Sequence, residues 1–128
     1  MSNAQPQNMR DATIRTVMFP RDTNPHGSIF GGHIMSLIDI AAGRQARKEA
    51  PHRYVTKKVS EVIFHAPVHV GDEVSIYTET LRVGTTSITI KVEVESLRGV
   101  DELTHHRVTE AEVVMVAVDE HGQPIPVH

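Results

Sequence analysis

The residues in this sequence that could do chemistry lie in one stretch, GSIFGGHIMSLIDIAAG, residues 27–43. A single carboxylate, Asp39, stands there among apolar and small residues, and two adjacent glycines, Gly31 and Gly32, precede it. An ionised aspartate can act as a general base or as a nucleophile. A glycine at a helix start leaves its unpartnered N–H group open to a developing oxyanion, although a close packing contact explains a glycine there equally well. The stretch therefore points to attack on a carbonyl group.

To position these residues the chain needs a helix, which we expect from about Gly31 to Glu49, with Pro51 as its stop. On a helical wheel of roughly 100° per residue, one side is apolar and should lie on a sheet: Ile34, Leu37, Ile38 and Ala41. The side that holds Asp39 is mostly small: Gly32, Met35, Ser36, Ala42, Gly43 and Ala46. A solvent-exposed aspartate is the alternative interpretation. Each glycine costs a helix about 1 kcal/mol relative to alanine, so we favour a side that a partner or substrate approaches.

The spacing of the two candidate groups adds a constraint. Gly31 and Asp39 are eight residues apart, which is roughly 12 Å along a helix at about 1.5 Å per residue. One carbonyl group cannot contact both from a single helix. If both act on it, they must come from two helices that lie side by side in a dimer, and the active site is then shared between protomers.

The rest of the chain has the pattern of strands and turns. We expect strands at 12–19, 73–83, 86–96 and 106–120, a β-rich segment at 54–67, a turn-rich loop at 21–28, a turn at 68–72 and a hairpin corner at Gly84 and Thr85. The strand at 86–96 has the cleanest alternation, with Ile88, Ile90, Val92 and Val94 on one face. This order predicts an α+β fold in which an antiparallel sheet packs on one central helix. Such a sheet leaves an edge open, which predicts pairing with a second copy.

Composition limits the function. The 128 residues make one domain, and residues 1–11 read as a flexible polar leader without the apolar core of a secretory signal. No stretch reaches the roughly 20 apolar residues of a membrane span. The absence of cysteine favours a cytoplasmic location and excludes a thiolate nucleophile. The net charge of −3 argues against nucleic-acid and anionic-membrane partners. His65 and His69 lack the geometry of a zinc motif, so we expect no metal.

Several motifs together resemble one family. DTNPHGSIFGGHIMSLIDIAAG is similar to the helix-entry motif of hotdog-fold acyl-CoA thioesterases, particularly the YciA-like acyl-CoA hydrolases. The likeness continues in order through FHAPVHVGDEVSIY, VGTTSITIKVEVE and RVTEAEVVMVAVDEHGQPIPV, and it covers nearly the whole chain from residue 12. It implies a hotdog fold over residues 12–128, with a long central helix wrapped by a five- to six-stranded antiparallel sheet. It also implies hydrolysis of acyl-CoA to a free carboxylic acid and coenzyme A, without a metal or redox cofactor.

The resemblance also implies roles for individual residues. Asp39 matches the helix carboxylate that acts as general base or nucleophile, and Gly31 matches the glycine whose N–H polarises the thioester carbonyl across the dimer interface. Asn24 stands where the family has a polar side chain near the carbonyl or the water. Lys91 is our first choice for the coenzyme A phosphates, and the residues expected to bind substrate are Gly32, Ser28, Thr86, Ser87, Lys91 and Arg82. Homodimers assembled into a hexamer, as a trimer of dimers, are expected as in relatives.

Two other functions compete with hydrolysis as explanations of the sequence. A hotdog dehydratase would use a catalytic histidine in a HFPG-like context, which the chain lacks. A non-catalytic acyl-CoA-binding regulator is the alternative, since it would keep the fold but could dispense with Asp39. The presence of Asp39 on a side of small residues favours catalysis. One departure from the family is NPHG at 24–27, and His26 has no expected catalytic role.

Overall fold

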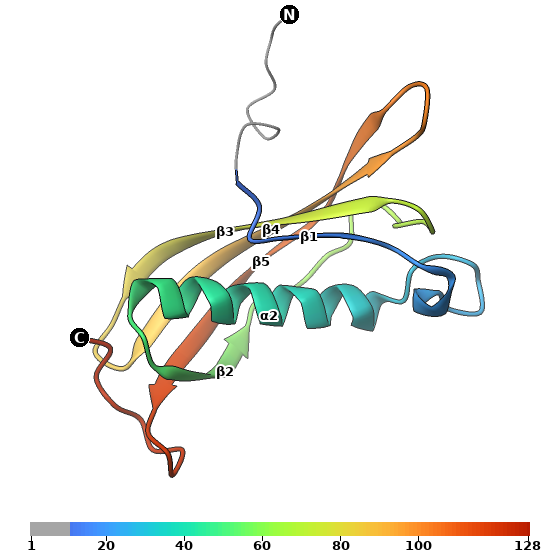
Figure 1. Cartoon of the computed structure of the whole chain (residues 1–128). Coiled ribbons are helices and arrows are strands. Elements are labelled where there is room, and N and C mark those ends of the chain that lie inside the picture. Colours follow the sequence, from blue (N-terminus) through green and yellow to red (C-terminus); the bar gives the residue numbers. More distant parts are fainter. Residues whose placement is uncertain (1–10) are drawn as a thin grey trace, which may run out of the picture.

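The structure, a computed structural model, describes residues 11–128, so the expected leader lies outside the described residues except for Asp11. One long helix, α2 (Gly31–Glu49), crosses the inner face of a curled five-stranded antiparallel sheet (Figure 1). The strands are β1 (Ile14–Val17), β2 (Arg53–Val59), β3 (Glu73–Val83), β4 (Ser87–Arg98) and β5 (Thr104–Val118), in the order β1-β3-β4-β5-β2. A short 3₁₀ turn, η1 (Pro20–Asp22), lies between β1 and α2. The predicted α+β architecture is confirmed.

The central strands provide the packing surface for the helix. The alternation predicted for β4 is confirmed, because its apolar row is fully buried: Ile88, Ile90, Val92 and Val94. Their register partners on β5 are buried too: Met115, Val113, Ala111 and Thr109. Burying an aliphatic side chain of this size contributes about 1.5–3 kcal/mol. A shift of the β4 pairing register by one residue would turn the whole row to the outer face of the sheet. This row therefore fixes which face of the sheet packs on the helix.

The helix α2 begins and ends where the sequence predicted. Its apolar side lies on the sheet, with Ile34, Ile38 and Ala41 buried and Leu37 half-buried. Near its C-terminal end Gln45 bonds to two threonines of β3, which fixes the helix against that strand. The packing therefore sets the rotation of α2 and, with it, the direction in which Asp39 points.

One side of α2 is more covered than expected. Ala42, Gly43 and Ala46 are buried within the protomer, so the prediction that a partner or substrate approaches this side of the helix is wrong at these three residues. The reason is the curl of the sheet, which brings β2 and β5 close to this side of the helix. A Cβ atom on Gly43 would lie 3.7 Å from Cε of Met115. These residues are small because strands pack closely against them, and the open side is reduced to the region around Asp39, where Gly32 and Ser36 are exposed.

Two strands are shorter than predicted. β1 is four residues long, and β2 ends at Val59 instead of continuing as a β-rich segment. Beyond Val59 the chain stays beside β5 through isolated bonds, from the N–H of Ser60 to the carbonyl of Glu112 (2.9 Å) and from the N–H of His65 to the carbonyl of Val108 (2.7 Å). The segment 60–67 is therefore irregular, although it follows the sheet edge. β3 spans the residues predicted for it.

A buried ion pair ties the next turn to the sheet. Asp72 is fully buried, and Arg98 at the end of β4 donates to both of its oxygens, Nε to Oδ1 and Nη2 to Oδ2, each at 2.8 Å. The N–H of His69 donates to the same carboxylate at 2.9 Å, and Arg98 Nη2 also donates to the carbonyl of Pro67 at 3.2 Å. Burial alone would raise the pKa of Asp72, but these hydrogen bonds and the charge of Arg98 outweigh it and lower that pKa. The pair thereby fixes the 67–72 turn.

Among residues 11–128 no helix combines the length and the apolarity that crossing a membrane requires.

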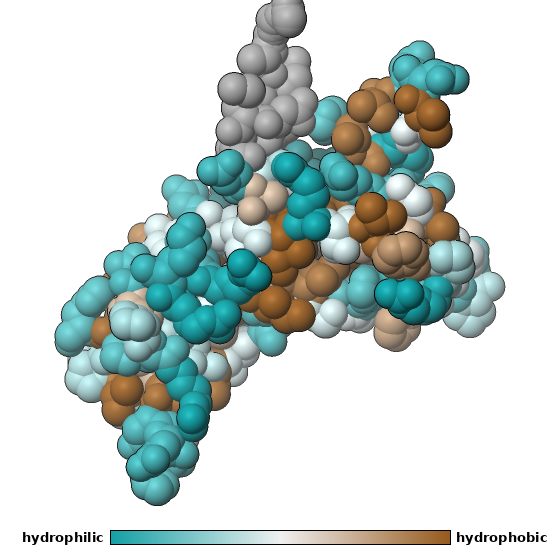
Figure 2. Space-filling view, in the orientation of Figure 1, coloured by the Kyte–Doolittle hydropathy of each residue, from teal (hydrophilic) through white to brown (hydrophobic). Residues whose placement is uncertain are grey.

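The surface is divided along α2. Hydrophilic residues cover the C-terminal half of the helix, and more hydrophobic residues gather toward its start (Figure 2). The apolar residues exposed near the start include Phe19, Phe30 and Phe64. This end of the helix carries the glycines of interest.

Candidate active site

Asp39 lies in the middle of α2 with its carboxylate exposed. Its Oδ1 accepts a hydrogen bond from Oγ1 of Thr56, a residue of β2. In the β2–β5 register Thr56 pairs with Met115, so its side chain lies on the helix side of the sheet, and its hydroxyl is 3.5 Å from the Met115 sulfur. Among the described residues no hydrogen-bond donor reaches the other oxygen of Asp39. The carboxylate is thus oriented through one oxygen, while the other is available for chemistry.

Thr56 is a site residue that the sequence analysis missed. It stands in the stretch RYVTKKV, where nothing in the local pattern separates it from an ordinary exposed strand residue. Its neighbour two residues before, Tyr54, is half-buried and donates a hydrogen bond to the carbonyl of Ala50. The period of two along a strand would have placed both side chains toward the helix. The pairing with Asp39, however, depends on how β2 returns along α2, which local patterns do not specify.

The start of α2 is open to an anion. No side chain of the described residues caps the helix, and Phe30 occupies the N-cap position. The backbone N–H of Phe30 donates a hydrogen bond to the carbonyl of Asp22 at 2.7 Å, which fixes Phe30 in place. Gly31 is the first helical residue, and a Cβ atom there would lie 3.9 Å from the ring of Phe64. The free N–H groups and the dipole make such a helix start favourable for negative charge.

Asn24 and Ser28 close the loop that leads into the helix. The Asn24 amide nitrogen donates to the Ser28 hydroxyl at 3.1 Å, and its oxygen accepts from the N–H groups of His26 (2.9 Å) and Ser28 (3.3 Å). The backbone adds a bond from the Asn24 N–H to the Ser28 carbonyl at 2.8 Å. Gly27 has a φ of 88°, a left-handed value that favours glycine. The Asn24 side chain is therefore engaged within its own loop, and it sets how the chain enters α2.

A hollow of about 320 Å³ opens beside the helix start. It is lined by Ser28, Ile29, Gly31, Ile34 and residues 64–68. The structure therefore brings together two of the predicted site residues, Ser28 and Gly31. It does not bring Asp39 to them within one protomer, because Asp39 lies roughly 12 Å further along the same helix.

The residues predicted to bind coenzyme A lie elsewhere. Thr86 and Ser87 are at the β3–β4 turn, which lies near the C-terminal end of α2 and far from its start (Figure 1). Ser87, Lys91 and the β3 residue Arg82 are on the outer face of the sheet. Lys91 is flanked in register by Glu79 and Glu112, and it lines a hollow that also contains Glu110. Its positive charge is therefore partly offset by neighbouring carboxylates.

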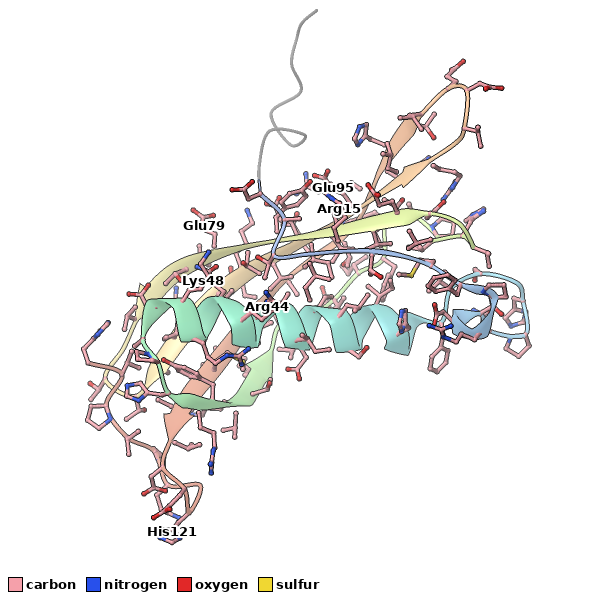
Figure 3. The ribbon with its side chains drawn as sticks, viewed as in Figure 1. Arg15, Arg44, Lys48, Glu79, Glu95 and His121 are labelled. Carbon is pink, nitrogen blue, oxygen red and sulfur yellow. The ribbon has the colours of Figure 1, made fainter. Side chains whose placement is uncertain are left out.

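A second group of cations lies on the helix itself. Arg44 and Lys48 project from the C-terminal half of α2 (Figure 3). Together with Arg47 they line a hollow of about 540 Å³, which Asp11 also borders. They lie where positive charge complements the helix dipole. Among the described residues, no three side chains of His, Asp or Glu lie grouped as metal ligands would.

Comparisons with known proteins agree with one another. The model of the thioesterase superfamily matches residues 26–102. The acyl-CoA thioester hydrolase YciA of Salmonella typhimurium is 41% identical over 118 residues, which cover 91% of this chain and 89% of that protein. A hexameric hotdog fold thioesterase of Campylobacter jejuni superposes with a TM-score of 0.88 at 39% identity, covering 94% of this chain and 92% of that one. An aspartate-to-alanine mutant of a hexameric broad specificity acyl-coenzyme A thioesterase superposes with a TM-score of 0.87 at 38% identity, covering 92% and 86%.

Proposed function

The chain belongs to the thioesterase superfamily and has the hotdog fold, and from that membership we propose that it hydrolyses acyl-CoA to a free carboxylic acid and coenzyme A. The observation that carries the proposal is Asp39, an exposed carboxylate on the central helix that Thr56 orients through one oxygen. An oriented carboxylate suits attack on a thioester carbonyl, and an open helix start, if supplied by a partner protomer, suits the oxyanion that forms. The relatives named for this activity align over most of the chain, which supports the same reaction here.

Asp39 can act in two ways, and both fit its environment. As a general base it takes a proton from water, whose oxygen then attacks the carbonyl carbon and expels the coenzyme A thiolate. As a nucleophile it attacks the carbon itself and expels the coenzyme A thiolate, and water then hydrolyses the resulting anhydride to regenerate Asp39 and release the free acid. In either route the carboxylate must be ionised and close to the carbonyl. The hydrogen bond from Thr56 occupies Oδ1 and leaves Oδ2 for the water or the carbon.

The oxyanion that forms in either route needs a donor, and we assign it to the N–H of Gly31 from a partner protomer. Within one protomer the two groups are separated by eight residues of helix, so the roughly 12 Å between them prevents joint action on one carbonyl. Two helices side by side and antiparallel would bring Gly31 of one to Asp39 of the other. Asn24 then lies near the reacting carbonyl or water, with Ser28 and Gly32 beside the substrate.

The assembly proposed is a homodimer that further associates into a hexamer, a trimer of dimers. Its support is the hexameric state of the two similar structures. β2 is an edge strand of the sheet and carries Thr56, so pairing along this edge would place the partner close to Asp39. Nucleic acid and membranes are not proposed as partners, and a cytoplasmic location is proposed from the absence of cysteine.

The coenzyme A part of the substrate is proposed to bind along the β3–β4 turn and the outer face of the sheet. Thr86 and Ser87 offer hydroxyl groups at the turn, and Lys91 and Arg82 offer positive charge beyond it. The phosphates are the strongest anions of the substrate, so Lys91 should be attracted to them despite its flanking glutamates, Glu79 and Glu112. Coenzyme A is here a part of substrate and product, and no metal or redox cofactor is proposed.

The test is direct. The purified protein is incubated with acyl-CoA esters and a dye that reacts with the released thiol, before and after treatment with a chelator. We expect thiol release in both cases at the same rate. Absence of release from every acyl-CoA would refute the hydrolase, and loss on chelation that added metal restores would refute the metal-free mechanism.

A further inference from the structure

The segment 124–128 returns to the turn between β3 and β4. The N–H of Val127 donates to the carbonyl of Thr85 at 2.8 Å, and the N–H of Ile125 donates to the carbonyl of Ala117 on β5 at 2.9 Å. The side chain of Val127 is buried in the hydrophobic core, with 2% of it exposed. Figure 1 shows this segment beside the β3–β4 turn and the C-terminal end of α2. The 124–128 segment is therefore a packed part of the fold that contacts the turn directly.

His52, in the link between α2 and β2, holds the segment from the other side. Its Nε2 lies 2.7 Å from the carbonyl oxygen of Val127, and this nitrogen must donate, because a carbonyl can only accept. The His52 ring also meets the Tyr54 ring edge to face, with 6.1 Å between the ring centroids. Tyr54 in turn donates to the carbonyl of Ala50, the C-cap of α2, at 2.8 Å. Val127 is thus bonded through both its N–H and its carbonyl, and His52 is fixed beside the end of the helix.

The β3–β4 turn does not have the conformation that a tight hairpin favours. Thr85 and Thr86 link the two strands, and the N–H of Gly84 donates to the carbonyl of Ser87 at 2.7 Å. Both favoured types of two-residue hairpin turn require a positive φ at the first central residue. Among the described residues only glycines have a positive φ, so Thr85 fits neither type. The turn therefore depends on support from outside the hairpin.

Two hydrogen bonds give that support. The carbonyl of Thr85 accepts from Val127, as described above, and the carbonyl of Thr86 accepts from the N–H of Ala117 at 2.9 Å. Neither donor belongs to β3 or β4. The bond from Ala117 extends the ladder between β4 and β5, whereas the bond from Val127 depends on the 124–128 segment. Without that segment, water would bind the Thr85 carbonyl, and this side of the turn would be free to move.

The turn also carries hydroxyl groups that the proposed function assigns to coenzyme A, those of Thr86 and Ser87. Resting on that proposed function, we propose that the 124–128 segment positions the β3–β4 turn for coenzyme A, and that His52 is the positioning residue that holds the segment there. A turn that is already ordered loses less conformational freedom when its ligand binds, and affinity is higher for that reason. His52 acts through Val127 and Thr85, without a contact of its own to the substrate.

The test measures binding of coenzyme A itself, so it does not require hydrolysis. The dissociation constant is determined by calorimetry for the full chain as wild type, His52→Ala, His52→Gln and His121→Ala. Glutamine keeps a side-chain N–H that can donate to the Val127 carbonyl, whereas alanine has none. His121 is the matched control, because it is a histidine near the same segment that projects away from the body of the protein, with 79% of its side chain exposed (Figure 3).

We expect His52→Ala to weaken coenzyme A binding about fivefold, the usual effect of losing one hydrogen bond. His52→Gln should stay within about twofold of the wild type, and His121→Ala should equal it. Hydrogen exchange at the Val127 amide, followed by NMR without ligand, should be at least about fivefold faster in His52→Ala than in the other three proteins.

Kinetics separate positioning from general damage to the fold. KM for acyl-CoA should rise about fivefold in His52→Ala with kcat unchanged. An acyl thioester of N-acetylcysteamine keeps the reacting group but lacks almost all of coenzyme A. All four proteins should hydrolyse it equally, whereas a purely structural defect would slow the hydrolysis of both substrates.

The proposal is overturned if His52→Ala binds coenzyme A as the wild type does, if glutamine does not restore binding, or if exchange at the Val127 amide is unchanged. An equal loss with the N-acetylcysteamine thioester would also refute it. Thiol release from acyl-CoA judges the hydrolase separately. The expected differences in coenzyme A binding without any hydrolysis would refute the hydrolase and support the positioning role, and a wild type that binds no coenzyme A would refute the positioning role.

Discussion

At the scale of single residues, Asp39 and Thr56 show what a sequence reveals about a site and what it leaves out. Asp39 could be proposed as a site residue because a lone carboxylate on a helix with three glycines departs from the usual pattern of an amphipathic helix. Thr56 could not, because a threonine in an edge strand is ordinary. Its importance comes from one contact made across 17 residues of chain, and such contacts depend on the fold rather than on local composition.

Replacing the carboxylate of Asp39 should abolish catalysis and leave the fold intact. Asp39→Asn nearly preserves shape but removes the charge that both routes require, so kcat should fall by at least about 10²-fold. The side chain is exposed, so thermal unfolding and assembly should be unchanged. Asp101→Asn, at the exposed β4–β5 turn, is the control and should keep full activity. Retention of more than a tenth of the activity by Asp39→Asn would contradict its role.

Thr56→Val tests whether the hydroxyl orients the base. Valine keeps the shape of threonine and removes the hydrogen bond to Asp39. Because the bond orients the reacting group, kcat should fall by about tenfold while KM stays near its wild-type value. Steady-state kinetics and a melting curve, measured on the same variant, distinguish orientation of Asp39 from a role in packing. A lower melting temperature with unchanged kcat would make Thr56 a packing residue only.

The Asp72–Arg98 pair should make stability depend on pH in a defined direction. The pKa of Asp72 is lowered in the folded protein from its ordinary 3.8, so its contribution is present above that value and is lost as pH falls through the folded pKa. Arg98→Met leaves a fully buried carboxylate without its partner and should cost about 3–5 kcal/mol at neutral pH. Urea unfolding at neutral and acid pH measures both effects.

The double variant Asp72→Asn with Arg98→Met is the control for that experiment. It removes the buried charge together with its partner, so it should recover a large part of the lost stability. The single variant Arg98→Met should regain stability as the pH falls, since burial then raises the pKa of the unpaired Asp72. If the single and double variants were equally stable at neutral pH, the buried charge would not be the cause.

At the scale of elements, the boundaries that carry strong local signals were predictable. The glycines and Pro51 mark both ends of α2, and the turn residues on either side of β3 fix that strand. β2 was predicted too long, because the apolar residues that follow it contact the sheet edge without forming a ladder. The covered side of α2 was also missed. A helical wheel gives the angular position of each side chain, whereas the curl of the sheet decides which of those side chains are buried.

The outer face of β4 carries the prediction about coenzyme A. Lys91→Ala should raise KM for acyl-CoA, by an amount that shrinks as salt increases, and should barely change kcat, because it removes binding common to substrate and transition state. Its two flanking glutamates make the effect modest, about threefold to tenfold. An unchanged KM for Lys91→Ala would remove this residue from the site.

At the scale of the whole molecule, the proposed mechanism divides one site between two protomers. In that mechanism the helix start with its adjoining hollow is one half, and Asp39 with Thr56 is the other. Sequence spacing was enough to predict that one helix holds Gly31 and Asp39 apart, because the rise of a helix is fixed; the division of the site between protomers stays a prediction. The sheet edge proposed for the dimer was not predictable from the sequence, because it depends on β2 being the edge strand that lies beside Asp39.

Mixed dimers test the division directly. Asp39→Asn subunits and Gly31→Val subunits should each be inactive alone, and mixing them under conditions of subunit exchange should restore activity. One of the two sites in a mixed dimer then has both an intact Asp39 and an intact Gly31. Exchange is followed with two affinity tags and activity by thiol release. Confirmed exchange without returned activity would show that each protomer works with its own residues.

The separation of Gly31 and Asp39 by eight residues of α2 also has a genetic consequence. In a shared site, a subunit with Asp39→Asn still lends its own Gly31 to the Asp39 of a normal partner. A cell that makes both forms should lose activity only in proportion to the defective subunits, so the allele would be recessive. An allele that damages both residues in one chain would disable both sites of every mixed dimer and would therefore be dominant.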